Sequence, residues 1–200
     1  MIVALKLWVC RTFYFVGLWW WRLWSHLYQS LWELKNGSYE LPRELNSEEI
    51  LNKLSLLRWE EDGFKELWDV CAGPEWVQMV LNELELGKTQ PPGGLDCDDF
   101  AIWAASVARD DYFPHVFILT WLSKDNKIKG HAMCLVHFNN GQNCFISNWG
   151  MSEPFIFISD GCEKILEEVG AREWIGWAAL DKGLRKVDGS VTVLPTRSFI

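Results

Sequence analysis

Residues 94–109 read GLDCDDFAIWAASVAR, and the rest of the chain can be placed around this run. The small residues after the acidic start recur at three- and four-residue steps, and they are Ala101, Ala104, Ala105 and Ala108. Such spacing is typical of a helix that packs closely against other elements. We therefore expect a buried helix over residues 97–109, entered directly from a loop rich in Gly and Pro at 87–94.

After this helix the pattern changes to alternation with a period of two and a β-rich composition. It predicts strands at Val116–Leu122, His131–Phe138, Cys144–Asn148, Trp174–Leu180 and Val191–Leu194. Asn140-Gly141 lies between the second and third of these strands and predicts a two-residue hairpin turn.

Helical signals dominate the part of the chain before residue 97. Asn46 or Ser47 is placed to cap a helix reaching about Arg58, with Glu49 completing a capping box. Pro74 suits the first position of a helix reaching about Leu86, and a later helix is expected at Gly161–Val169. A helical N-terminal half followed by strands predicts an α+β fold with the 97–109 helix packed on an antiparallel sheet.

Composition and charge narrow the classes of function. The chain has 200 residues, 49% of them hydrophobic and 23% charged, which suits a single domain with a sizeable core. Its net charge is -8, and no basic run interleaved with aromatic residues indicates a nucleic-acid partner. The six cysteines show no CxxC spacing, and no cleavable signal is evident, so reduced thiols and a cytoplasmic location are expected.

Residues 1–37 form a distinct hydrophobic, amphipathic helical segment ahead of a domain at 38–200. Residues 1–35 hold four Lys and Arg against one Glu, and six of the fourteen tryptophans. Polar residues make one stripe on this otherwise apolar helix. The stripe consists of Arg22, Ser25, His26, Gln29, Ser30 and Glu33. The longest uncharged stretch, Thr12–Trp21, is too short to span a bilayer. Two alternatives stay open for residues 1–35: peripheral membrane contact as an in-plane anchor, or packing on the domain or a partner subunit.

Cys97 is the first candidate for chemistry because it stands at the start of a helix. The positive end of the helix dipole and the unpaired N–H groups there favour a thiolate, and the preceding loop would let a substrate approach. The plainer alternative is a small buried hydrophobic residue, and the other five cysteines are interpreted in that way.

His131 is the expected base, since it follows Gly130 at the beginning of a strand. If Asn140-Gly141 is a two-residue turn, Met133 lies opposite Asn148, and Asn148 then shares the face of His131 and is placed to orient its imidazole. Ser147 would point to the other face. A bulge in the hairpin would reverse this assignment.

With these residues in place, the chain resembles a known family. The runs Gly94–Ala101, Gly130-His131-Ala132 and Ile146-Ser147-Asn148 are similar to the bacterial and bacteriophage branch of the transglutaminase-like cysteine peptidases. Upstream resemblance extends to Asp62, Trp68-Asp69 and Pro74-Glu75. The family usually has Asp before the Asn of the second strand, where this chain has Ser147.

The resemblance implies a papain-like or transglutaminase-like core and a thiol-dependent hydrolase. Such a peptidase or amidase would form an acyl-enzyme at Cys97 on a protein or peptide substrate, with His131 as base and Asn148 as orienting residue. Two alternatives stay open: an acyl transferase, and a catalytically silent module for binding or assembly. Gln90 is a candidate oxyanion-hole side chain.

Three carboxylates beside the thiol raise the question of a cation. Asp96, Asp98 and Asp99 surround a residue that must become an anion, and like charges oppose that ionisation. Calcium bound by these acids would compensate, because it prefers oxygen ligands, and related family members depend on calcium. The alternative is that the three acids only cap and favour the first turn of the helix.

Overall fold

The structure is a computed structural model, and it describes residues 2–36, 39–59, 73–90 and 95–191. The five α-helices of this described part are α1 (Ile2–Asn36), α2 (Ser47–Leu54), α3 (Pro74–Glu85), α4 (Cys97–Val107) and α5 (Ile158–Glu168). Its strands are β1 (His115–Ser123), β2 (Ile128–His137), β3 (Asn143–Ser147), β4 (Gly150–Met151), β5 (Ala171–Leu180) and β6 (Lys186–Val191). This order confirms the predicted α+β class.

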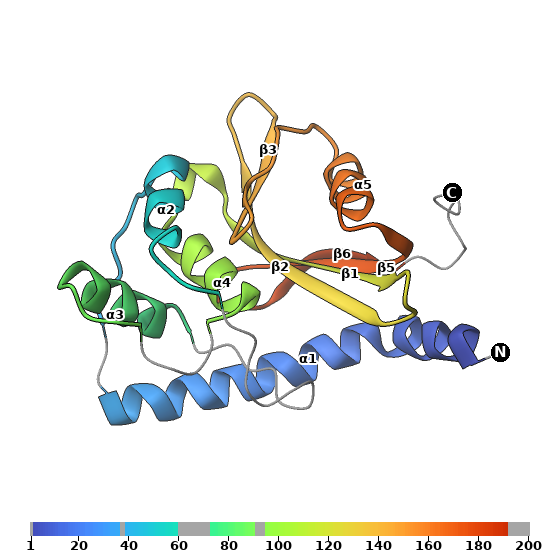
Figure 1. Cartoon of the computed structure of the whole chain (residues 1–200), viewed down its shortest axis with the longest axis horizontal. Helices are drawn as coiled ribbons and strands as arrows, with labels where there is room; N and C mark the ends of the chain where they lie inside the picture. Colours follow the sequence, from blue (N-terminus) through green and yellow to red (C-terminus); the bar gives the residue numbers. More distant parts are fainter. Residues whose placement is uncertain (1, 37–38, 60–72, 91–94, 192–200) are drawn as a thin grey trace.

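The six strands form one open antiparallel sheet in the order β4-β3-β2-β1-β5-β6. Helices α2, α3 and α4 lie together on one side of it and α5 lies on the other (Figure 1). The central strands are buried on both faces because a helical layer covers each face.

Two hydrophobic clusters fill the space between the layers. The larger one joins α2, α3 and α4 to the side chains of Ala132, Cys134 and Val136 on β2. The smaller one joins α5 to Met133 and Leu135, the alternate residues of the same strand. Successive strand side chains point to opposite faces, so this split identifies which face each β2 residue occupies.

Local signals placed the starts of α2, α3 and α4 correctly, whereas α5 begins at Ile158 and not at the predicted Gly161. Asn46 accepts from the Glu49 N–H while the Glu49 carboxylate accepts from the Asn46 N–H, which is the predicted capping box. Pro74 is the first residue of α3, as expected. Helix α2 ends at Leu54 and not near Arg58, and the short strand β4 was not predicted. Strand β6 was not predicted either, because it shares only Val191 with the predicted strand Val191–Leu194. The predicted strand after Val191, the boundary near residue 37, and Asp62, Trp68 and Asp69 lie outside the described residues.

Helix α1 is longer than the polar stripe suggested, and it turns that stripe toward the domain. Ser25 is fully buried, Arg22, His26 and Gln29 are half-buried, and Gln29 packs against Gly73. Nearer the N-terminus, Tyr14, Leu18 and Trp21 pack on the larger cluster, and the Tyr14 hydroxyl lies 3.3 Å from Thr120 Oγ1. Among the described residues, no helix combines the length and the apolarity that crossing a bilayer requires.

Candidate active site

Cys97 occupies the first position of α4, where sequence analysis placed it. Asp96 is the N-cap, and its carboxylate accepts the Asp98 N–H at 3.1 Å. The Asp99 carboxylate accepts the Asp96 N–H at 3.4 Å and completes a capping box. The half-buried thiol therefore stands at the positive end of a well-capped helix, which favours its anionic form.

A backbone donor from β2 reaches the sulfur. The Ala132 N–H donates to Cys97 Sγ at 3.4 Å. The pairing of β2 with β3 ends at Cys134 and Ile146, so Ala132 pairs with Ile118 of β1 but has no partner on β3. A hydrogen bond to the sulfur favours the thiolate over the thiol.

The same contact brings Cys97 next to the second predicted residue. The Ala132 nitrogen belongs to the peptide bond that follows His131, and it lies about 2.4 Å from the His131 Cα by standard backbone geometry. The sulfur is therefore within about 6 Å of that Cα, given its 3.4 Å distance to the nitrogen. Cys97 and His131 are 34 positions apart in the chain and lie close together near the beginning of β2.

The two side chains approach β2 from different faces. Cys97 packs with the larger cluster, on the α4 side. His131 alternates with Ala132 and pairs with Leu119, which belongs to the smaller cluster on the α5 side. Its imidazole stacks on the Trp149 ring, with centroids 3.6 Å apart and planes 10° from parallel. Trp149 thus covers the imidazole of His131 directly.

Burial dominates the electrostatics of His131. The residue is 4% exposed, and desolvation lowers the pKa of its imidazole to about 4. Its Nε2 atom is buried and has no hydrogen-bond partner among the described residues. The ring is therefore neutral at physiological pH, when it can accept a proton at one nitrogen and donate from the other.

The predicted hairpin register is wrong by one residue. The loop has three residues, 139–141, closed by the Gly141 N–H to Phe138 and the Phe138 N–H to Gln142. Consequently His137 pairs with Asn143, and the paired residue numbers sum to 280 instead of the expected 281. A two-residue type I′ turn needs positive φ at both central residues, whereas here only Gly141 adopts it, at 81°.

This register removes the geometric argument for Asn148. Extended by one residue, it places Ser147 opposite Met133, and both line one cavity. Asn148 lies beyond the end of β3 in the turn to β4, with a buried Oδ1 that has no hydrogen-bond partner among the described residues. The Ser147 hydroxyl instead accepts the Trp149 N–H at 3.1 Å and holds that turn.

The three acids are close enough to share an ion. One carboxylate oxygen from each of Asp96, Asp98 and Asp99 lies within 4.8 Å of the others. Their oxygens also serve the helix start, because Asp98 Oδ1 accepts the Asp99 N–H at 3.0 Å in addition to the two capping bonds. Both interpretations from the sequence are compatible with this arrangement, so calcium binding stays a prediction.

Other candidate residues have different roles. The Gln90 side chain accepts a hydrogen bond from the Arg58 N–H at 2.7 Å and donates one to the Arg58 carbonyl at 2.8 Å. Both amide atoms are therefore engaged and do not contribute to an oxyanion hole. Burial raises the pKa of the Cys134 and Cys162 thiols to about 12. Cys71 lies outside the described residues.

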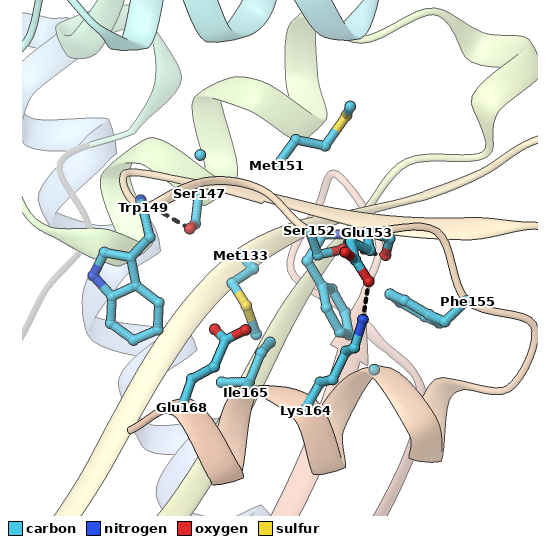
Figure 2. Close-up of a pocket in the computed structure, with 13 residues that line it drawn as sticks. Met133, Ser147, Trp149, Met151, Ser152, Glu153, Phe155, Lys164, Ile165 and Glu168 are labelled. Atoms are coloured by element: carbon cyan, nitrogen blue, oxygen red, sulfur yellow. Dashed lines mark hydrogen bonds and ion pairs between the residues drawn. The ribbon is translucent and has the colours of Figure 1, made fainter. Parts of the chain in front are cut away.

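A cavity of about 410 Å³ opens beside Trp149, between α5 and the β3–β4 hairpin. Figure 2 shows Met133 and Ile165 between Trp149 and the Lys164–Glu153 ion pair. Its lining combines apolar side chains such as Phe145 with that ion pair. The cavity borders the ring that covers His131, on the face of the sheet opposite α4.

No known family model matches the chain, and no curated protein is significantly similar to it.

Proposed function

We propose that this protein is a thiol-dependent hydrolase, a peptidase or amidase with a transglutaminase-like core, that forms an acyl-enzyme at Cys97. The observation that carries the proposal is the Ala132 N–H donating to Cys97 Sγ at 3.4 Å, at the first position of a capped helix. It supports a stabilised thiolate adjacent to the residue proposed as its base, His131.

In the proposed reaction the Cys97 sulfur attacks the carbonyl carbon of an amide or peptide bond. Because the His131 side chain lies on the other face of β2 from the thiol, its ring must first turn toward the sulfur. The thiol proton then passes to a His131 ring nitrogen and on to the departing amine, leaving a thioester on the sulfur. Water then adds to the thioester with His131 as base, and it releases the acid and regenerates the thiol. An amine in place of water would complete an acyl transfer by the same first half-reaction.

Asn148 stays the proposed orienting residue, on grounds other than the hairpin count. Its buried Oδ1 is a hydrogen-bond acceptor without a partner among the described residues, and the buried Nε2 of His131 likewise has none there. An Nε2–H and an amide oxygen are complementary in type. Pairing them would hold the imidazole with its other nitrogen free for the thiol proton.

A second candidate is a catalytically silent binding or assembly module, and the state of His131 favours it. The imidazole lies under Trp149 with its pKa lowered to about 4 by burial. The family's usual Asp is replaced by Ser147, whose hydroxyl is engaged with the Trp149 N–H. A base this weak would slow proton abstraction unless the ring becomes more exposed when substrate binds.

Acylation of the thiol separates the two candidates. The purified full chain is incubated near neutral pH with p-nitrophenyl acetate, and acetylated residues are mapped by mass spectrometry. We expect rapid acetylation of Cys97, loss of it in Cys97→Ala, and a rate at least about tenfold lower in His131→Ala. Recovery of free thiol over time would report deacylation by water, and added amines would report transfer.

Matched controls are available in the same chain. Cys10→Ala removes another half-buried thiol, and His137→Ala removes another half-buried imidazole. Neither change should alter the rate at Cys97. Preferential acetylation of Cys10, or an unchanged Cys97 rate in a folded His131→Ala protein, would reject the hydrolase and support the silent module.

A further inference from the structure

The outward face of α1 is an exposed apolar surface that runs from Val9 to Leu31, about six turns. Its exposed members recur at three- and four-residue steps and include Val16, Trp20, Leu23, Leu27 and Leu31. Each of the five is about half exposed, between 47% and 58%. The opposite side of the helix already packs on the domain through Tyr14, Leu18 and Ser25, so the apolar face points away from the domain.

This arrangement is the reverse of an ordinary surface helix. A helix on a globular protein normally buries its apolar stripe and exposes its polar one. Here Arg22, Ser25, His26 and Gln29 face the domain, whereas Ser30 is exposed. Among the residues from 8 to 34 whose side chains the structure describes, the exposed side chains are uncharged. Figure 1 shows α1 lying along one side of the molecule, where a flat surface could meet its whole length. Contiguous exposed apolar area of this extent marks an interaction site.

Charge distinguishes between possible occupants. Residues 1–35 carry four cationic side chains and one anionic, a net charge of +3, whereas the rest of the chain carries -8 minus 3, which is -11. An anionic lipid surface attracts such a segment. A second copy of the same helix carries the same net charge of +3, so pairing two copies is opposed by their net charge.

The width of the apolar face supports the same occupant. A two-stranded coiled coil needs only a narrow seam of alternating three- and four-residue steps, flanked by charged pairs. Here the positions beside that seam hold the exposed side chains of Trp19 and Tyr28, which widen the apolar face and supply no charge pairs. Tryptophan is enriched at the boundary between lipid headgroups and acyl chains.

We propose that α1 docks the protein on an anionic membrane surface, lying in the plane of the interface with its outward face among the headgroups and upper acyl chains. The domain is then held above the lipid on the other side of the helix. The inference is independent of the chemistry proposed for Cys97.

Co-sedimentation of the full chain with vesicles tests this proposal. Two vesicle types are used, pure phosphatidylcholine and phosphatidylcholine with about a third phosphatidylserine, each at low and high salt. The test variant is Leu23→Gln with Leu27→Gln, which removes apolar surface without changing charge. The matched control is Leu86→Gln, on an exposed leucine (77% exposed) at the end of α3.

We expect the wild type and the Leu86→Gln control to bind serine-containing vesicles more tightly than pure phosphatidylcholine, with weaker binding at high salt. The double variant should bind at least about tenfold more weakly while keeping its circular dichroism and thermal midpoint. Absence of wild-type binding, or equal binding by the double variant, overturns the proposal. It is also overturned if the wild type is a lipid-independent dimer in sedimentation equilibrium that the double substitution converts to monomer.

Discussion

Replacing Trp149 with alanine should raise the pKa of His131. The indole ring covers the imidazole at a centroid distance of 3.6 Å, and burial alone lowers the pKa from 6.5 to about 4. The shift of about 2.5 units corresponds to about 3 kcal/mol, at about 1.36 kcal/mol per unit. Stacking on an aromatic face favours the charged ring by only about 0.5 to 1 kcal/mol, so removing the indole should let desolvation relax and move the pKa upward.

The sign of the pH effect follows from proton counting. Between pH 4 and 6.5 the unfolded chain holds a proton on His131 and the folded chain does not, so the free energy of unfolding rises with pH in this window. Acidification from pH 7 to 4 should therefore cost about 3 kcal/mol through this residue. His131→Asn should remove that part of the slope, and Trp149→Ala should reduce it.

Two measurements check the argument. Proton NMR titration of the histidine ring signals, with the His131 signal assigned by its loss in His131→Asn, gives the pKa directly. Urea unfolding at several pH values gives the slope. A wild-type pKa near 6.5, or a pKa that stays near 4 in a folded Trp149→Ala protein, would refute the burial argument.

Three further predictions concern the surroundings of the thiol. Ser147→Ala should lower the free energy of unfolding by about 1 kcal/mol in urea titrations, because the Ser147 hydroxyl accepts a hydrogen bond from the Trp149 N–H. The rate of Cys97 alkylation by iodoacetamide should stay unchanged. Asn148→Ala should slow that alkylation at least about tenfold; a larger effect from Ser147→Ala would make the serine the orienting group. Calcium restored at millimolar concentration after chelation should raise both the thermal midpoint and the alkylation rate, and Asp98→Asn should abolish both gains. If neither quantity changes, the three acids only cap the helix.

Local chemistry in the sequence was enough to place the starts of α2, α3 and α4. The capping box at Asn46, the proline at the start of α3, and the position of Cys97 at the start of α4 all follow from patterns within a few residues. The start of α5 at Ile158 was not predicted. The strands of the sheet centre were also foreseen, because side-chain alternation is a property of the strand itself.

The register and the faces required the tertiary structure. Asn140-Gly141 is compatible with a two- or a three-residue loop, and the difference moved Asn148 off the face of His131. No sequence pattern predicted that Trp149 would stack on His131. His131 lies on β2 and Trp149 lies in the turn between β3 and β4, so the two rings meet only because the strands pair.

Helix α1 shows the same division. Its amphipathic spacing is a local property and was visible in the sequence. Which side would face the domain depended on the partners: Tyr14 packs on the sheet, Gln29 lies against Gly73 and Ser25 is fully buried, and this packing turns the tryptophan-rich side outward. Periodicity defines the two faces of a helix, but only contacts between distant segments decide which one is buried.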